Sequence, residues 1–339
     1  MRPLDGDRGL RVEAPIMKIL VTGCAGFIGS KVSETLARNG HEVLGVDTLN
    51  DAYDPRLKTW RLDRLRRMPR VAVQQLDITD EAALSELSQR HQIDAVVNLA
   101  ARAGVRQSIL TPDAYYTTNV IGTLRLLDLC RTRDIKKFVL ASTSSLYAGG
   151  DCPFREDQPT DRPLSPYAAS KKAAEVLCYT YHHLYRLDVA VLRYFTVYGP
   201  AGRPDMAVFR FVRWLREGEP LVVHGDGSQE RDFTYVDDVA DATLRALNLT
   251  GYEIVNVGND RPVSVRHVIT LLERAIGRPA RLAHQPIHPA DMPATWADIG
   301  KARRLLAWEP RTSVEDGLGA AARWYEENRS WASHIAVGD

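Results

Sequence analysis

The chain has 339 residues, with 44 lysines and arginines against 43 aspartates and glutamates. This near balance excludes the large positive field that attracts nucleic acid or an anionic membrane, so neither is expected as a partner. The length exceeds what one hydrophobic core usually fills, and it predicts a large domain with a smaller lobe. Four cysteines without CxxC spacing predict reduced thiols and a cytoplasmic location.

The N-terminal segment is polar and lacks the apolar core that a signal peptide needs. We predict a disordered leader over residues 1–16. No later apolar run approaches the roughly 20 residues that span a bilayer.

Short apolar runs alternate with longer amphipathic stretches in the first part of the chain. This alternation is typical of βαβ units. It predicts an α/β fold of the Rossmann type, a doubly wound parallel sheet that is covered on both faces. The runs that we expect to form strands are 18–22, 42–47, 71–75, 95–99, 138–142 and 189–193.

After about residue 195 proline and glycine become frequent and the helical stretches shorten, which indicates a smaller mixed α/β substrate lobe. Residues 237–248 again look helical and 253–257 resemble a buried strand, so the chain is expected to return to the large domain. The predicted divisions are 17–193 plus about 236–257 for the nucleotide-binding domain, 194–235 plus about 258–330 for the substrate lobe, and 331–339 for a tail.

A glycine-rich segment follows the first predicted strand. Gly23, Gly26 and Gly29 lead into the amphipathic stretch 31–38. Glycine there permits a tight turn and lets backbone N–H groups approach a pyrophosphate at a helix N-terminus. Asp47, eighteen residues after Gly29, ends the second strand and can bind an adenosine ribose. An acid at that position favours NAD, because it would repel a 2′-phosphate. An ordinary tight turn is the alternative for the glycines.

Tyr167 and Lys171 are one helical turn apart, so both project from one helix face. A phenol that acts as a base near neutral pH needs its anion stabilised. We expect Lys171 and the positive nicotinamide ring to lower the pKa of Tyr167. Thr143, Ser144 and Ser145 end the fifth strand, at the edge where such sheets bind ligands, and Thr143 can share a proton with the alcohol that Tyr167 deprotonates. Chance spacing and a Ser/Thr turn are the structural alternatives.

In this order the residues resemble the extended short-chain dehydrogenase/reductase family, from Met17 to about Trp324. Within it the chain is most similar to the NAD-dependent nucleotide-sugar 4-epimerases that act on UDP-glucuronate. The glycine loop and the Tyr/Lys pair mark only the superfamily, whereas the later segments are more specific. The segments that carry the resemblance are 22–30, 47–55, 98–106, 193–200, 202–206 and 231–238.

The resemblance implies NAD as the cofactor, with Tyr167 as catalytic base and Lys171 as its partner. Asp77 and Ile78, after the third strand, can border the adenine, although an ordinary loop acid fits nearly as well. The expected cofactor-binding residues are Gly23, Gly26, Phe27, Ile28, Gly29, Asp47, Asn50, Asp77, Ile78, Leu99, Ala100, Ala101, Asn119, Tyr167, Lys171 and Tyr194.

The resemblance also implies contacts with a UDP-sugar. Arginine suits its phosphates because the planar guanidinium binds oxygens bidentately, and a surface ion pair is the alternative for each arginine. Arg106 or Arg193 is a candidate for the sugar carboxylate, although either can serve a phosphate or a structural pair. The expected substrate-binding residues are Arg106, Thr143, Ser144, Ser145, Arg193, Thr196, Arg203, Val223, Arg231 and Asp291.

Oxidation of the hydroxyl at sugar carbon 4 gives a ketone from which related enzymes diverge. Decarboxylases and dehydratases of the superfamily resemble one another in carrying an acid beside the catalytic threonine. Here Ser144 and Ser145 follow Thr143, which favours hydride return to the other face and 4-epimerisation of UDP-glucuronate. Both serines are expected to hold the sugar carboxylate in an unreactive orientation. The alternatives are a UDP-glucose or UDP-N-acetylglucosamine 4-epimerase, a UDP-glucuronate decarboxylase, and a catalytically silent NAD(H)-binding regulator.

The family further implies a homodimer, formed through the helix after Tyr167 and the helix around 118–130. His224, His284 and His288 lack the spacing of a zinc site, so no metal is expected. Five arginines in residues 60–70 alternate with apolar residues at helical spacing. This pattern favours a solvated helix face over a nucleic-acid patch.

Overall fold

Residues 16–287 and 292–337 are described by a computed structural model, and their centre is a seven-stranded sheet in the order β11-β6-β5-β4-β1-β2-β3. All neighbouring strands of this sheet are parallel, which confirms the predicted Rossmann-type architecture. The order reverses between β1 and β4, where open parallel sheets bind ligands. The strands are β1 (Lys18–Thr22), β2 (Glu42–Asp47), β3 (Val71–Gln75), β4 (Ala95–Asn98), β5 (Lys137–Thr143), β6 (Asp188–Tyr194) and β11 (Tyr252–Val257).

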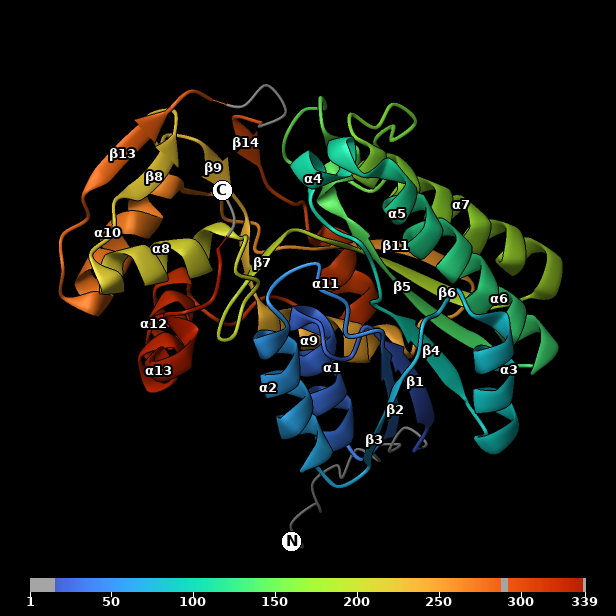
Figure 1. The fold of residues 1–339 in the computed structure, drawn as a ribbon. Helices are drawn as coiled ribbons and strands as arrows, with labels where there is room; N and C mark the ends of the chain where they lie inside the picture. The colour runs from blue at the N-terminus through green and yellow to red at the C-terminus, as the bar shows by residue number, and fades with distance from the viewer. Residues whose placement is uncertain (1–15, 288–291, 338–339) are drawn as a thin grey trace, which may run out of the picture.

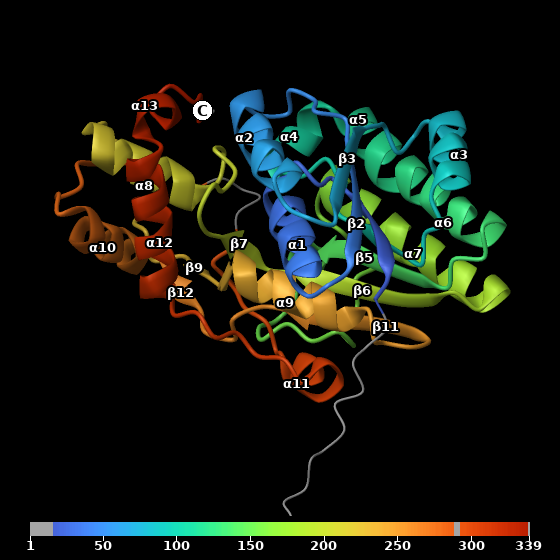
Figure 2. The same cartoon turned by 90° about the horizontal axis from the view of Figure 1, so that it is seen from below.

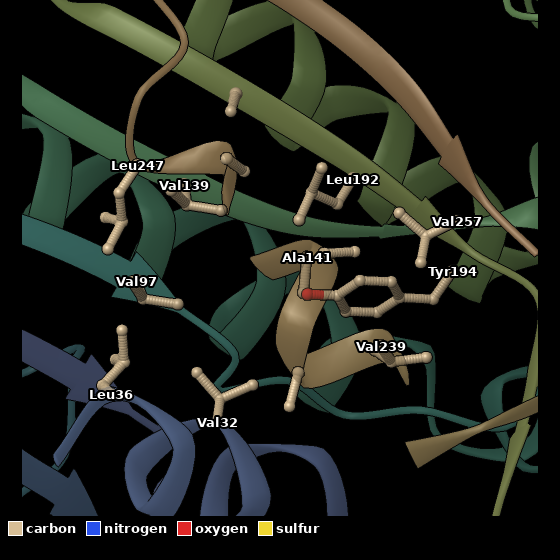
Figure 3. Packing of buried hydrophobic residues seen from close by; sticks show 14 of the residues in the cluster. Val32, Leu36, Val97, Val139, Ala141, Leu192, Tyr194, Val239, Leu247 and Val257 are labelled. Atoms are coloured by element: carbon tan, nitrogen blue, oxygen red, sulfur yellow. The ribbon is translucent and has the colours of Figure 1, made fainter. Parts of the chain in front are cut away.

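Helices cover both faces of the sheet (Figure 1). Successive strand residues point to opposite faces, so Ile19 and Val21 pack in one buried cluster and Leu20 in another. Figure 3 shows the first cluster, where Val32 and Val239 lie beneath the strands. Its helices are α1 (Phe27–Arg38), α2 (Pro55–Arg66), α9 (Val236–Ala246) and α11 (Gly300–Leu306). The other helices of the domain are α3 (Glu81–Arg90), α4 (Val105–Leu110), α5 (Pro112–Tyr116), η1 (Thr117–Ile121), α6 (Gly122–Thr132), η2 (Ser144–Tyr147) and α7 (Pro166–Tyr185).

The smaller lobe has a hydrophobic cluster of its own, in which three helices contribute Phe209, Val268 and Leu318. Figure 2 shows these helices, α8, α10 and α12, grouped to one side of the sheet. The helices are α8 (Ala207–Glu217), α10 (Val265–Ile276), α12 (Val314–Glu327) and α13 (Arg329–Ala332). The short strands are β7 (Thr196–Tyr198), β8 (Leu221–His224), β9 (Glu230–Arg231), β10 (Phe233–Tyr235), β12 (Val263–Ser264), β13 (Leu282–Gln285) and β14 (Ala294–Thr295).

The chain crosses between the two parts several times. After the first part of the small lobe, α9 packs on α1 and β11 joins the main sheet beside β6. The sequence placed 258–330 in the small lobe, but α11 returns to the large domain, where Ala302 and Leu306 join the core. The predicted tail is also corrected, because Ala332 and Ile335 are fully buried in the small-lobe cluster. Such short segments carry too little periodicity to show which core they join.

Three further expectations concern the ends and surface of the molecule. Apart from Ile16, the predicted leader lies outside the described residues. The arginine-rich helix α2 differs from a wholly solvated face, because Arg61 is only 2% exposed whereas Arg64 is exposed. No helix in the described ranges combines the length and the hydropathy required to traverse a bilayer.

Candidate active site

A cavity of about 490 Å³ opens at the carboxyl edge of the main sheet, against the segment that leads into the small lobe. The strand ends position most of its wall, because the loops after parallel strands meet at one edge. Its described lining includes these predicted residues: Gly23, Gly26, Phe27, Ile28, Gly29, Asp47, Asn50, Asp77, Ile78, Leu99, Ala100, Ala101, Thr143, Ser144, Ser145, Tyr167, Lys171, Tyr194, Thr196 and Arg203.

The glycine loop between β1 and α1 is packed so closely that side chains cannot replace its glycines. Gly23 has φ +70°, and a Cβ there would lie 2.8 Å from the backbone nitrogen of Ala100. A Cβ on Gly29 would overlap with the Gly23 carbonyl oxygen, and the Gly26 N–H donates to that oxygen at 2.9 Å. The loop therefore presents bare backbone at the N-terminus of α1, an arrangement that fits a pyrophosphate.

Asp47 lies at the end of β2, 8% exposed, and lines the same cavity. Its carboxylate accepts from the Ala25 N–H at 3.1 Å and from the Leu49 N–H at 2.8 Å, which ties the acid to the glycine loop. Lys58 Nζ lies 3.9 Å from Asp47 and donates to Asn50 at 2.8 Å. Burial lowers the pKa of Lys58, and the charge of Asp47 opposes that shift. The acid, the glycine loop and the open space between them fit the adenosine half of NAD.

Tyr167 and Lys171 lie on the first two turns of α7, which begins where the Ser165 hydroxyl accepts from the Ala168 N–H at 3.2 Å. The Thr143 hydroxyl lies close enough to the Tyr167 phenol to lower the pKa of that phenol, and Thr143 also accepts from the Ser145 N–H at 3.1 Å. The predicted base and the predicted hydroxyl run therefore meet in one place.

The electrostatics of this pair differ from the prediction. Burial raises the pKa of Tyr167, while the hydrogen bond from Thr143 and the nearby Arg203 guanidinium lower it. Lys171 does not act on the phenol as expected, since its Nζ donates to the Ala141 carbonyl at 2.8 Å. Burial also lowers the pKa of Lys171 to about 8, against the charge of Glu175. Burial removes water from the ammonium, and the cost of this desolvation exceeds the favourable effect of the Glu175 charge, which is the physical reason for the shift.

Arg203 is the predicted arginine that reaches the cavity, and its side chain is 23% exposed. It donates to the Ala103 carbonyl at 3.2 Å and forms a bidentate pair with Asp205 at 3.0 and 2.6 Å. One guanidinium edge is thus fixed beside Tyr167, on the segment that enters the small lobe.

Arg193 corrects the prediction of a substrate contact. It is 1% exposed, and its Nε and Nη2 donate to the Glu175 carboxylate at 2.9 and 2.8 Å. Its Nη1 donates to the Tyr147 hydroxyl at 2.7 Å. Strand alternation turns Arg193 toward α7, whereas its neighbour Tyr194 points to the opposite face of the sheet, where its hydroxyl lies 2.8 Å from that of Thr243 in α9. Arg193 is therefore a structural ion pair.

Other predicted residues also lie outside the cavity lining. Asn119 is 1% exposed and holds the backbone of Arg102 through bonds of 2.9 and 3.0 Å, so it supports the wall from behind. Val223 is buried in the small-lobe core. Arg231 donates to the Glu230 carbonyl at 2.8 Å, and Arg106 approaches His224 at 3.3 Å.

Asp291, a predicted substrate-binding residue, and His288, one of the histidines that lack zinc spacing, lie outside the described residues. Within the described ranges, no three histidine, cysteine or acidic side chains converge in a way that would hold a metal.

Sequence reasoning missed Lys58, Tyr53, Arg102 and Met206, which also line the cavity. Arg102 stands inside the segment 98–106 that carried the resemblance, so its position was a usable signal. Tyr53 and Met206 likewise stand inside the segments 47–55 and 202–206. Lys58 lies outside all of these segments, and its inward orientation depends on how α2 packs on α1.

Comparison with known proteins agrees with this geometry. The model of the NAD dependent epimerase/dehydratase family matches residues 19–258. The chain belongs to this family. As an epimerase/dehydratase family member it uses NAD, and the glycine loop and Asp47 are the parts of the structure that fit the cofactor.

Several members of the epimerase/dehydratase family are similar over almost the whole chain. A UDP-glucuronate 4-epimerase of Thermodesulfobacterium geofontis is 54% identical over 319 residues, which are 94% of this chain and 99% of the relative. A crystal structure of UDP-glucuronic acid 4-epimerase from Bacillus cereus, in complex with UDP-glucuronic acid and NAD, has a TM-score of 0.87 and 39% identity and covers 92% of this chain and 100% of that chain. A UDP-glucose 4-epimerase of Thermotoga maritima, with UDP-glucose, has a TM-score of 0.84 and 32% identity, with coverages of 92% and 100%.

Proposed function

We propose that this chain converts UDP-glucuronate to UDP-galacturonate by NAD-dependent epimerisation at carbon 4. The observation that carries the proposal is the grouping of Thr143 and Tyr167 in the same cavity as the glycine loop. A hydroxyl and a phenol so placed can remove the proton from a secondary alcohol. The 54% identical UDP-glucuronate 4-epimerase supports the choice of sugar.

The charges of the cavity suit a substrate with both phosphates and a carboxylate. Among its described lining residues, Lys58, Arg102, Lys171 and Arg203 are basic, and Asp47 and Asp77 are acidic. Asp47 ends β2 and Asp77 follows β3, so both acids lie at the end of the cavity that fits adenosine. The sugar end has hydroxyls at Ser144 and Ser145 beside Thr143, and hydroxyls can bind a carboxylate without supplying an acid for proton chemistry at carbon 5.

Each protein group has a defined task in the reaction. The Thr143 hydroxyl relays the proton of the sugar 4-hydroxyl to Tyr167. The same groups return the proton after the keto sugar has rotated to present its opposite face. Arg203 favours the phenolate because its charge lowers the pKa of Tyr167. NAD, when bound, supplies the chemistry by accepting a hydride from carbon 4 and giving it back. Lys171, fixed to the Ala141 carbonyl, holds a proton and positive charge behind the reacting face.

The test is incubation of the purified protein with UDP-glucuronate and NAD, followed by proton NMR of the anomeric signals. New signals of UDP-galacturonate are expected, with an equilibrium approached from either isomer. Turnover of UDP-glucose or UDP-N-acetylglucosamine alone would contradict the choice of sugar, and no turnover of any of them would contradict the reaction.

The absence of an acid beside Thr143 can be tested separately with Ser145→Glu. The variant removes a carboxylate-binding hydroxyl and adds a proton donor, so we expect slower epimerisation and the appearance of the decarboxylated UDP-pentose. Product analysis with Ser145→Ala as the control separates the two causes. Unchanged stereochemistry, rate and pentose yield in Ser145→Glu would contradict the role of Ser145.

We also propose a homodimer formed through α7 and its neighbours, which lie side by side (Figure 1). Val176 and Tyr179 of α7 are each 54% exposed, and Ile121 is 42% exposed. A two-fold bundle of four helices would bury these apolar side chains. Sedimentation equilibrium should give twice the chain mass for the parent and a lower mass for Val176→Glu.

A cytoplasmic location is part of the proposal. Cys24, Cys130, Cys152 and Cys178 are all free thiols, and Cys152 is the one with partial exposure. Burial raises the pKa of Cys152, which disfavours its thiolate form. Unpaired thiols are typical of a reducing compartment.

A further inference from the structure

Arg61 of α2 is a buried guanidinium at the boundary between the two parts of the molecule. It is 2% exposed, although it belongs to an arginine-rich helix whose other arginines face solvent. Among the described residues it forms no ion pair with a carboxylate. A buried charge without a counter-ion is costly unless its donors are satisfied, so the contacts that satisfy it define its role.

The guanidinium holds two loops that are far apart in the sequence. On one side Nη1 donates to the Ala25 carbonyl at 3.1 Å and to the Tyr53 hydroxyl at 2.7 Å. On the other side Nη2 donates to the Ala201 carbonyl at 2.6 Å and to the Gly202 carbonyl at 3.3 Å, while Nε lies 3.3 Å from the Ala201 carbonyl. The guanidinium is planar and rigid, so these bonds fix the spacing of the two loops.

The first loop carries the cofactor site. Ala25 stands between the glycines that face the pyrophosphate, and its N–H already donates to Asp47 at 3.1 Å. Arg61 binds the carbonyl of the same residue. The glycine loop is therefore held from one side by the ribose-binding acid and from the other by Arg61.

The second loop carries Arg203 of the sugar site. Ala201 has φ +52°, a left-handed conformation that is unfavourable for alanine and must be held by its surroundings. Gly202 directly precedes Arg203, and Met206, just before α8, lines the cavity as well. Figures 1 and 2 show that α2 lies beside this segment, which connects β7 to α8.

We propose that Arg61 is a positioning residue that couples the two halves of the active site. When NAD orders the glycine loop, the fork of Arg61 orders the loop of Arg203, and less conformational entropy remains to be lost when the UDP group binds. Binding of NAD therefore strengthens binding of UDP, and the reverse holds by linkage. This inference rests on the proposed UDP-sugar site and names how that site is prepared.

The test is the affinity for UDP, measured by calorimetry on the full-length protein, first freed of NAD and then saturated with it. UDP is used because it is not turned over. For the parent protein NAD should strengthen UDP binding at least about fivefold, the lower end of typical coupling between sites. In Arg61→Lys the charge remains but a single nitrogen cannot reach both loops, so the strengthening should fall below about twofold.

The matched control is Arg64→Lys, the same exchange one turn along α2, where the exposed guanidinium lies 5.0 Å over the ring of Trp60. It should retain the coupling of the parent. Tyr53→Phe provides a milder variant should Arg61→Lys fold poorly, because it removes one partner of the fork and keeps the ring. It should give an intermediate coupling.

Three outcomes would overturn the inference. The first is coupling at the parent value in both Arg61→Lys and Tyr53→Phe, and the second is an equal loss in Arg64→Lys. The third is weaker binding of each ligand alone in Arg61→Lys with unchanged coupling, which would assign to Arg61 a purely electrostatic role. Failure of the proposed function appears elsewhere, as a parent protein that binds UDP but does not epimerise UDP-glucuronate.

Discussion

The two ends of the active-site cavity are built in different ways. The cofactor end consists mostly of backbone, because the glycine loop offers N–H groups and leaves no room for a side chain at Gly29. The sugar end consists of side chains from separate elements: Thr143 ends β5, Tyr167 begins α7, and Arg203 lies on the way to α8. A backbone site is fixed by sterics and serves one cofactor, whereas a side-chain site can be altered residue by residue to suit different sugars.

The contrast predicts that changes at the sugar end affect turnover, whereas changes at the cofactor end affect binding and folding. It also predicts that position in the fold, and not residue type, decides the role of an arginine.

The largest effect is expected from Tyr167→Phe. Loss of the phenol removes the proton acceptor, and turnover of UDP-glucuronate should fall by about 10²- to 10⁴-fold with NAD and UDP binding retained. Proton NMR measures the rate and calorimetry the binding. Tyr115→Phe is the control, because that ring lies 6.1 Å from Tyr167 and its hydroxyl donates only to the Ala103 and Gly104 carbonyls. Equal rates for Tyr167→Phe and the parent would refute the mechanism.

Arg203 and Arg193 should respond in opposite ways to the same exchange. Arg203→Met removes the cavity guanidinium that is proposed to bind the substrate, so KM for UDP-glucuronate should rise about 10- to 100-fold. Arg193→Met removes the bidentate partner of the buried Glu175 carboxylate and leaves it with Ser142 and the longer contact to Lys172, so the free energy of unfolding should fall by about 3–5 kcal/mol. Urea unfolding measures the free energy of unfolding of both variants, and steady-state kinetics measure their KM. A raised KM in folded Arg193→Met would restore it as a substrate residue.

Gly29→Ala tests whether backbone sterics define the cofactor end. The added Cβ would meet the Gly23 carbonyl, which cannot move without opening the loop, so the unfolding free energy should fall by about 1–3 kcal/mol and NAD binding should weaken. Gly319→Ala in α12 is the matched exchange. Its Cβ would meet only the flexible end of Arg323 at 3.3 Å, and there the change should be neutral or slightly stabilising. Similar losses at both positions would argue against a special constraint at Gly29.

The smallest effect concerns the pH dependence of stability at Lys171. Its pKa in the folded protein is about 8, below the 10.5 of the free group. Between these two pKa values the unfolded chain binds more protons at Lys171 than the folded chain does. Burial of Lys171 therefore lowers the free energy of unfolding at neutral pH, and this loss disappears as the pH rises from the folded to the unfolded pKa. The difference in unfolding free energy between the parent and Lys171→Met should therefore shift in favour of the parent as the pH rises from about 8 to about 10.5. A constant difference would show that the lysine is not perturbed by burial.

Several features followed from the sequence because they depend on neighbours along the chain. The glycine spacing, the acid at the end of the second strand and the Tyr167/Lys171 pair are local patterns, and the alternation of apolar runs was enough to predict the parallel sheet. The carboxyl edge gathered Thr143 and Tyr167 because that edge is common to all strands of such a sheet.

Only the tertiary structure decided which polar groups face the cavity. Arg193 and Arg203 have the same chemistry, yet one meets Glu175 under α7 and the other reaches the cavity. Arg61 and Arg64 lie one turn apart on the same helix, and the packing of α2 buries the first and exposes the second. The physical reason is that burial and pairing depend on which element packs against a side chain, and the spacing of residues along the chain does not contain that information.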